Sequence, residues 1–207
     1  MLFDYIIQNY KEGEPIFFAD LLIEGTSKAA ASQQLKTLCK NGKLMKYGAG
    51  VYYMPKKSSL KSAVGPTADM VARYRFISKG NHVDGFYAGN TFANQLGISD
   101  QVPQVVEIVS NNTNSSPREI TIGNRRFFVK KPVAVINAEN VYTLQMLDLL
   151  KNLDVYLDDT YESARAKFSE YIRLHEIKRT DIDQYIRSYP AAIFKYYYEL
   201  ELDRVFA

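Results

Sequence analysis

The sequence predicts an α+β protein with a small N-terminal domain and a larger mixed α/β domain that ends in a helical third. Three observations predict this class. Apolar residues recur at helical spacing in the first 40 residues, β-prone segments flank turn residues farther on, and helical spacing returns from about residue 138. The polar segment Ser58–Thr67, with its Gly65-Pro66, is typical of a linker. We therefore expect domains at residues 1–57 and 66–207.

Length and composition limit the class of protein. The chain has 207 residues, of which 46% are hydrophobic, so a small and a larger core can form. Its apolar runs fall short of the ~18 residues that cross a bilayer, and its start lacks the features of a signal peptide. Cys39 is the sole cysteine, so an intramolecular disulfide is excluded. We expect a cytoplasmic protein with no membrane partner.

Charge is divided unevenly along the chain. The net charge is only +3, yet residues 26–61 contain eight lysines and no acid. From Glu139 to the end there are 13 acids and 9 bases. An asymmetry of this kind indicates a polyanionic partner for the basic end. A lysine-rich face that is merely solvated is the alternative, and charge alone does not decide between them.

Three helices are expected before residue 43. The first covers residues 2–10, where Leu2 and Ile6 have helical spacing. The second starts at Pro15 and runs to Leu22. Thr26 and Ser27 are both good N-caps for the third helix, which we expect from Lys28 to about Lys40, closed by Asn41-Gly42.

A β-hairpin is expected after the third helix. In Lys43–Met54, two short β-prone arms lie on either side of a glycine-rich turn. Three helices followed by a hairpin is the plan of a winged helix-turn-helix domain. In that plan the third helix enters the major groove of DNA, while the hairpin, or wing, lies along the phosphates or reaches the minor groove.

The residue types in this segment suit double-stranded DNA as a partner. Serine, threonine and glutamine can read base edges, whereas lysines act as point charges on phosphates. The candidate DNA-binding residues are Thr26, Ser27, Lys28, Ser32, Gln33 and Lys36 on the helix, Lys43, Lys46, Tyr47, Gly48 and Gly50 in the wing, and Lys56 and Lys57 behind it. If six lysines met phosphates, the salt slope would be about −5. A protein-interaction module is the alternative.

The same segment resembles a known family. After a helix with Leu-x-x-Leu, the pattern Gly-x-Leu-x-x-x-Gly-x-Gly-Val-Tyr is typical of the N-terminal winged helix of AbiEi-type antitoxins. The matching positions are Leu35, Leu38, Gly42, Leu44, Gly48, Gly50, Val51 and Tyr52. The resemblance continues weakly through Tyr87–Ile98 and Gln101–Pro103 and covers about residues 1–135.

The resemblance implies an antitoxin of a type IV toxin–antitoxin (abortive infection) system. Such antitoxins bind and repress their own promoter through the winged helix. Their second domain counters a nucleotidyltransferase toxin, directly or without a stable complex. A plain winged-helix transcriptional regulator, with a ligand-sensing or dimerisation domain, is the runner-up. The sequence leaves the oligomeric state open, a homo-oligomer included.

The second domain is expected to contain a small sheet followed by helices. Its hairpin turns around Gly123-Asn124 and carries five basic residues. The expected strands are Gln104–Ser110, Arg118–Ile122, Arg125–Lys131 and Val133–Ile136, and the expected helices are Ala68–Ser78, Phe86–Leu96, Asn137–Lys151, Tyr161–Leu174, Thr180–Arg187 and Ala191–Val205.

The basic residues of this hairpin form a candidate second patch. Its members are Arg118, Arg125, Arg126, Lys130 and Lys131. The patch would extend the DNA footprint or contact RNA. The alternative is the solvated outer face of an antiparallel hairpin.

The motifs of common enzyme classes are missing from the sequence. It has no Walker loop, no Gly-x-Ser-x-Gly and no His-Glu-x-x-His, and Asp154–Asp159 lacks the spacing of a nucleotidyltransferase site. We therefore assign no catalytic residue, metal ligand or cofactor and expect no enzyme. A nuclease that uses Asp84, Asp100 or Glu107 is the remaining alternative from that class.

Overall fold

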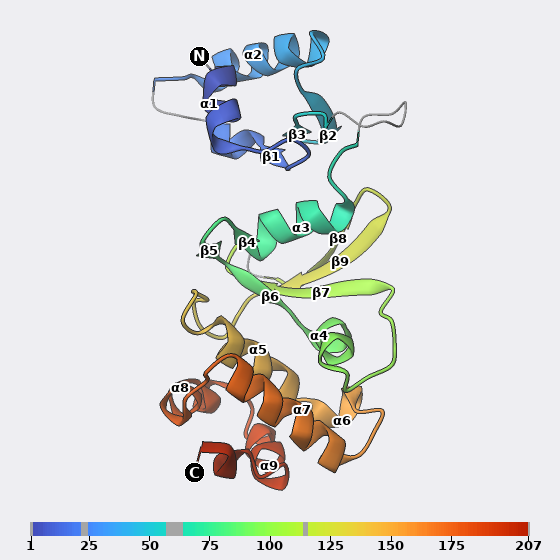
Figure 1. Cartoon of the computed structure of the whole chain (residues 1–207), viewed down its shortest axis with the longest axis vertical. Coiled ribbons are helices and arrows are strands. Elements are labelled where there is room, and N and C mark those ends of the chain that lie inside the picture. The colour runs from blue at the N-terminus through green and yellow to red at the C-terminus, as the bar shows by residue number, and fades with distance from the viewer. Residues whose placement is uncertain (1, 22–24, 57–63, 114–115, 207) are drawn as a thin grey trace. The chain divides into compact units, whose positions relative to one another are not determined.

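The computed structural model describes residues 2–21, 25–56, 64–113 and 116–206, and the protein belongs to the α+β class (Figure 1). The chain divides into two units, Met1–Val71 and Ala72–Ala207. Most of the expected linker, residues 58–63, lies outside the described residues. Among the helices that the structure describes, none is long and apolar enough to span a membrane.

The first unit combines two α-helices with a three-stranded antiparallel sheet. The strand order is β1-β3-β2, so β1 joins the edge of the β2–β3 hairpin. A core of Leu2, Ile6, Leu21, Leu35 and Leu44 lies between the helices and the sheet. Its elements are α1 (Leu2–Asn9), β1 (Ile16–Phe17), the 3₁₀ helix η1 (Phe18–Leu21), α2 (Lys28–Lys40), β2 (Met45–Gly48) and β3 (Val51–Tyr53).

The expectation of a helix from Pro15 to Leu22 is wrong for its first half. Ile16 and Phe17 form a strand that pairs with Tyr52 and Val51 of β3, and helical turns begin only at η1. The partner strand lies far away in sequence, so local propensity gave no sign of it. Leu22 lies outside the described residues.

Helix α2 begins and ends where its caps predict. The Ser27 hydroxyl accepts a hydrogen bond from the amide of Ala30 at 3.1 Å, which satisfies one of the free N–H groups of the first turn. At the other end Gly42 has φ +68°, a conformation that favours glycine and stops the helix. Of the two expected N-caps, Ser27 takes the role and Thr26 does not.

The second unit is built on a four-stranded mixed sheet with the order β6-β7-β9-β8. Strands β7 and β9 are parallel, and the two outer pairs are antiparallel. The elements around it are α3 (Ala68–Phe76, which crosses the boundary of the units), β4 (Ser78–Lys79), β5 (His82–Val83), β6 (Gly85–Tyr87), α4 (Gly89–Leu96), β7 (Val105–Ser110), β8 (Arg118–Ile122) and β9 (Arg125–Lys130).

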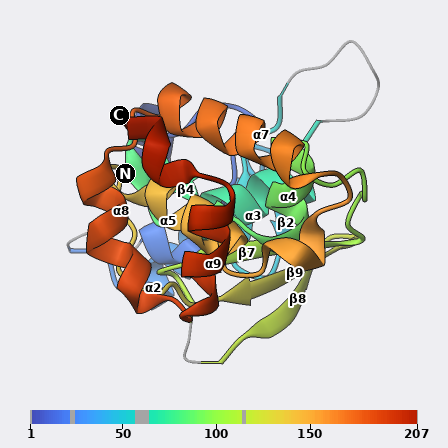
Figure 2. The same ribbon diagram turned by 90° about the horizontal axis from the view of Figure 1, so that it is seen from below.

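The C-terminal third is helical, as expected. Helix α5 is its centre, because nine of its ten residues are buried, and the later helices surround it (Figure 2). Its elements are α5 (Val141–Leu150), α6 (Leu153–Tyr156), α7 (Tyr161–Leu174), α8 (Arg179–Tyr185), η2 (Ile186–Ser188), α9 (Ala192–Glu199) and η3 (Leu202–Phe206). The expected bounds of α7 and of the β8–β9 hairpin around Gly123-Asn124 are confirmed, with β9 ending at Lys130.

Two expectations for the second unit are wrong. The segment expected as a helix from Phe86 begins as strand β6, and α4 starts only at Gly89. Residues 133–136 form no strand, because the backbone of Ile136 is bound by a side chain instead. Its amide donates to Oδ1 of Asn111 at 3.0 Å, and its carbonyl accepts from Nδ2 of Asn111 at 2.8 Å. Two expected helices also differ in their bounds: the one expected from Asn137 starts at Val141, and the one expected over Ala191–Val205 is divided into α9 and η3.

Candidate functional site

Helix α2 presents one apolar and one polar face. Ala31 and Leu35 are buried at 0% and 1% exposure, while Lys28, Gln33 and Lys36 are exposed. For Gln33 and Lys36 this separation follows from the helical period, which places every third or fourth residue on the core side. Lys28 has the same register as Ala31 and is exposed at the first position of the helix. Of the other expected contact residues, Ser27 is exposed and Thr26 and Ser32 are half-buried. The side chains expected to read DNA thus lie outside the core.

The start of α2 has a favourable charge for phosphate. Its first turn carries no acidic residue, so the partial positive charge of the helix N-terminus is not neutralised by its own side chains. Lys28 adds a full charge at the first helical position. The Ser27 hydroxyl oxygen accepts the capping hydrogen bond with one lone pair, so its hydrogen can still be donated to a ligand.

The β2–β3 hairpin contributes the second set of expected contact residues. Lys46 is exposed on β2 opposite Tyr52, and Tyr47 lies at the register shift between Lys46 and Gly48. Gly50 has φ +71°, and its carbonyl accepts a hydrogen bond from the amide of Phe18 at 2.8 Å. This bond ties the turn to η1, so the hairpin is held to the body of the first unit.

The remaining lysines of the set differ in their surroundings. The amine of Lys43 lies 4.7 Å from the ring centre of Phe3, a cation–π contact that fixes the side chain on α1. Lys56 is exposed and forms an isolated β-bridge with Val64. Lys57 lies outside the described residues. Lys43 therefore has a structural contact besides its expected role on phosphate.

The five residues of the second basic patch do not share one free surface. Arg126 pairs with Glu119 at 3.3 Å, and Lys130 reaches Asp148 at 3.2 Å with only 22% of its side chain exposed. Arg118 lies near Arg75. Burial lowers the pKa of Arg75, and the positive charge of Arg118 lowers it further. Arg125 and Lys131 are exposed. The hairpin is thus less strongly basic than its sequence indicates.

The three acids considered for a nuclease serve local roles. Oε1 of Glu107 accepts a hydrogen bond at 3.0 Å from the amide of Asn90, at the start of α4. A Cβ at the preceding residue, Gly89, would meet that carboxylate at 2.1 Å, and the φ of +52° at Gly89 favours glycine there. Asp84 pairs with His82 at 3.0 Å, and the amide of Asp100 donates to Asp158. Within the described residues no cluster of three or more His, Cys, Asp or Glu could hold a metal ion.

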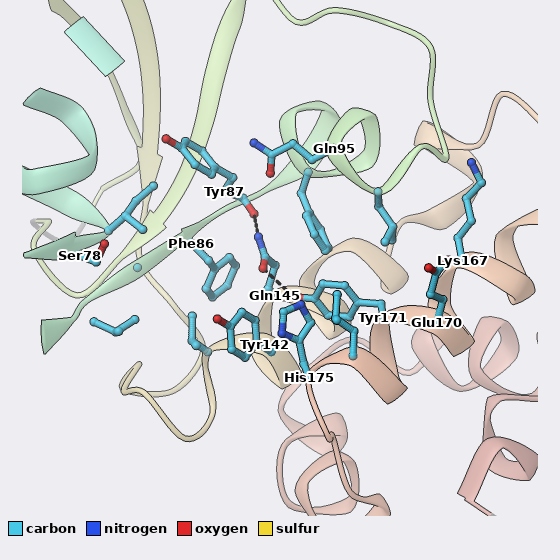
Figure 3. A pocket seen from close by; sticks show the side chains of 17 residues that line it. Ser78, Phe86, Tyr87, Gln95, Tyr142, Gln145, Lys167, Glu170, Tyr171 and His175 are labelled. Atoms are coloured by element: carbon cyan, nitrogen blue, oxygen red, sulfur yellow. Dashed lines mark hydrogen bonds between the residues drawn. The ribbon is translucent and has the colours of Figure 1, made fainter. Parts of the chain in front are cut away.

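A pocket of about 560 Å³ opens in the second unit (Figure 3). Its walls come from the segment after α3, from β6, and from helices α4, α5 and α7. The residues that line it are Ile77, Ser78, Val83, Gly85, Phe86, Tyr87, Phe92, Gln95, Leu96, Val141, Tyr142, Gln145, Lys167, Glu170, Tyr171, Leu174 and His175. This volume lies within the ~300–1,000 Å³ typical of small-molecule sites.

Gln145 forms the polar centre of this pocket. Its Nε2 donates to the carbonyl of Tyr87 at 2.8 Å, and its Oε1 accepts from the hydroxyl of Tyr171 at 2.8 Å. These two bonds, drawn in Figure 3, fix the orientation of the amide. The side chain belongs to α5 and joins β6 to α7, which ties the sheet to the helical third.

Aromatic rings form the wall beside Gln145. His175 stacks on Tyr142 with ring centres 3.7 Å apart, and the tilted ring of Tyr171 has its centre 4.4 Å from that of His175. Burial lowers the pKa of His175 and raises that of Tyr171, so both rings are uncharged at neutral pH. Tyr142 lines the pocket and is 41% exposed, whereas the other nine residues of α5 are buried.

The pocket was not predicted from the sequence. Its residues come from elements separated by up to about 100 positions, and no short motif joins them. One local signal was present, because His175 follows directly after the predicted helix Tyr161–Leu174, four residues beyond Tyr171 and therefore close to its face. That spacing identifies neighbours but cannot show which other elements face them.

Comparison with known proteins gives a family but no function. No curated protein matches the chain. A family model described as "Family of unknown function (DUF6088)" matches residues 3–178, which span most of both units. The chain therefore belongs to this family of unknown function, DUF6088.

Proposed function

We propose that this chain is a sequence-specific DNA-binding repressor that acts as the antitoxin of a type IV toxin–antitoxin system. In this proposal the first unit is a winged helix-turn-helix domain that binds the protein's own promoter. Helix α2 is its recognition helix, and the β2–β3 hairpin is its wing. The second unit counters a nucleotidyltransferase toxin.

The polar face of α2 carries this proposal. It holds the exposed side chains of Gln33 and Lys36, and Lys28 is exposed at the start of the same helix, within a stretch that has eight lysines and no acid. Glutamine can form two hydrogen bonds to a base edge in the major groove, and the lysines supply charge for phosphates. A face built only for solubility would usually mix both signs of charge.

The order of elements in the first unit agrees with the proposal. A helix and a short strand precede η1 and α2, and a hairpin follows. Because Ser27 caps α2 directly after the turn, the start of the helix is fixed, and its first residues can be presented to a groove. The carbonyl of Gly50 holds the hairpin to η1, which gives the wing a defined position within the unit.

The antitoxin role rests on the resemblance to AbiEi-type antitoxins. The matching pattern covers the end of α2 and the hairpin as far as Tyr52, including Gly48 and Gly50. Glycine at the second of these positions is explained by its φ of +71°, which other residues rarely adopt. The toxin-neutralising activity of the second unit is inferred from the family alone.

The DNA-binding part is tested with charge reversal on α2. We expect the double variant Lys28→Glu and Lys36→Glu to lose binding to the protein's upstream DNA, measured by fluorescence anisotropy at moderate salt. Both side chains are exposed, so circular dichroism should show an unchanged fold. The matched control is Arg173→Glu with Arg187→Glu in the second unit, which changes the net charge equally at exposed positions. Equal binding by both double variants would contradict the assignment of α2.

The antitoxin part is tested separately. The proposal predicts a nucleotidyltransferase-like reading frame beside this gene. Co-expression of this chain with that enzyme should restore growth that the enzyme alone stops. Rescue should persist in the Lys28→Glu and Lys36→Glu variant supplied from a foreign promoter, because neutralisation is assigned to the second unit. Growth arrest despite full expression of the chain would overturn the antitoxin role and leave a plain regulator.

A further inference from the structure

The pocket of the second unit has no role in the proposed binding of DNA. It lies between the sheet and helices α4, α5 and α7, and its centre is the fixed amide of Gln145 (Figure 3). The chemistry of its walls indicates what kind of molecule it can hold. Three properties decide this: the shape of the apolar wall, the free hydrogen-bonding atoms and the sign of the charges.

The apolar wall suits a flat ring. Phe86, Phe92 and Tyr171 are buried at 3%, 4% and 7% exposure, and they line the inner part of the pocket. The stacked pair of Tyr142 and His175 stands at its mouth. Aromatic faces bind other rings by stacking, whereas a flexible aliphatic chain gains no such geometry.

The amide of Gln145 suits a ring that carries both donors and acceptors. A primary amide has two donor hydrogens and two acceptor lone pairs. Tyr87 and Tyr171 use one of each, so one N–H and one lone pair remain on the same planar group. A donor and an acceptor on one amide are the groups with which glutamine pairs to the edge of adenine.

The charges around the pocket disfavour phosphate. Among the described residues that line it there is no arginine, and the amine of Lys167 donates to the carbonyl of Gly97. The carboxylate of Glu170 is exposed at the lining, and His175 is uncharged at neutral pH because burial lowers its pKa. A phosphate would meet a negative charge without a free guanidinium to neutralise it.

We propose that this pocket binds a flat, unphosphorylated heteroaromatic molecule of the nucleobase or nucleoside class. The ring stacks against the aromatic wall next to Tyr142, and its polar edge bonds to the amide of Gln145. The carboxylate of Glu170 accepts from hydroxyl or amino groups of the ligand. The site is separate from the DNA-binding face and does not depend on the function proposed for that face.

The test is calorimetric titration of the full chain with the four ribonucleosides and their 5′-monophosphates. At least one nucleoside should bind with saturation, and its monophosphate should bind more weakly. Tyr142→Ala should weaken nucleoside binding about tenfold, because it removes a stacking partner. Tyr198→Ala is the matched control, since this tyrosine is also exposed, at 58%, and does not line the pocket.

Two further variants keep the test decisive. Gln145→Leu should weaken binding about tenfold or more by removing the paired hydrogen bonds. Since Gln145 also bridges two elements, this variant counts only if circular dichroism shows an unchanged fold. Glu170→Gln, at an exposed position, should bring the affinity of the monophosphate close to that of the nucleoside.

Three outcomes would overturn the proposal. The first is that no nucleoside binds at millimolar concentration. The second is that a monophosphate binds more tightly than its nucleoside, which would indicate recognition of phosphate. The third is that Tyr142→Ala and Tyr198→Ala bind the nucleoside equally, which would place the ligand elsewhere on the chain.

Discussion

The two units of this protein differ in where the polar residues of their candidate sites lie. The first unit has a small core and displays its polar residues on the outside of α2 and on the β2–β3 hairpin. The second unit has a core of 26 buried hydrophobic residues and encloses its polar residues, as Gln145 and Asp148 show at 9% and 6% exposure. An exposed, basic face suits a large polyanion, whereas an enclosed pocket suits a small ligand.

This contrast explains why the two candidate sites differ in how they depend on folding. The residues of α2 need only a capped helix with one buried face, which local sequence determines. The pocket requires four distant parts of the chain to meet around Gln145. A change at Gln145 should therefore affect stability and pocket together, while changes at the exposed Lys28 and Lys36 of α2 should affect binding alone.

The largest effect on stability is expected at Asp148, whose carboxylate lies between Lys130 and Lys151 and ties β9 to α5. Asp148→Asn would leave two lysines without their counter-charge. We expect a loss of about 3 kcal/mol in the free energy of unfolding, the lower end for a broken buried pair, because both amines partly reach water. Urea denaturation followed by circular dichroism measures it.

Asp183→Asn is the matched control for that change. The Arg179–Asp183 pair is exposed, at 59% and 63%, and its atoms are 3.8 Å apart. Exposed pairs of this kind contribute less than about 0.5 kcal/mol. If both variants lost the same free energy of unfolding, the enclosed Asp148 carboxylate would contribute no more than an exposed one. That result would contradict the expected contribution of enclosed charges in the second unit.

A medium effect is expected when equivalent helix caps are removed from the two units. Ser27 caps α2, and Thr160 caps α7 by accepting from the amide of Ser163 at 3.2 Å. Each change to alanine should lower the free energy of unfolding by about 1 kcal/mol. Only Ser27→Ala should also weaken binding to promoter DNA, since it loosens the start of the recognition helix. An equal loss of DNA binding in both variants would contradict the assignment of DNA binding to the first unit.

The smallest effect is a dependence on pH in the second unit. Burial holds the pKa of His175 below its ordinary value of 6.5. Between the lowered pKa of the folded chain and the ordinary value of 6.5, the unfolded chain binds more protons than the folded chain. The free energy of unfolding should therefore fall as the pH drops through 6.5. His175→Phe keeps a ring against Tyr142 and should reduce this fall. Urea midpoints at about pH 7.5 and about pH 5.5 measure it, and an unchanged pH dependence would contradict the burial of this ring.

Local features could be predicted from the sequence, and distant pairings could not. The bounds of α2 and α7 and the turn at Gly123-Asn124 were predicted correctly, because caps and turns are set by adjacent residues. Strand β1 was missed because its partner, β3, lies about 35 residues away. Strand β6 was missed for the same reason, since β7 supplies its hydrogen bonds.

The two candidate sites follow the same rule. The exposed face of α2 was visible in the spacing of Ala31 and Leu35, which identifies the opposite face. The ion pair between Lys130 and Asp148 could not be predicted, because it depends on where α5 packs. The apolar neighbours of Tyr142 in the sequence likewise gave no sign that its ring is 41% exposed and lines a pocket.

The central claim is that the first unit binds DNA by its basic face. The most direct test is the affinity of the full chain for its own upstream DNA across a range of salt concentrations, with a random duplex as the control. We predict tight, sequence-selective binding and a logarithmic salt slope of about −5, as expected for about six phosphate contacts. Weak binding, or equal affinity for the random duplex with a flat salt dependence, would contradict the claim and make the first unit a protein-interaction module.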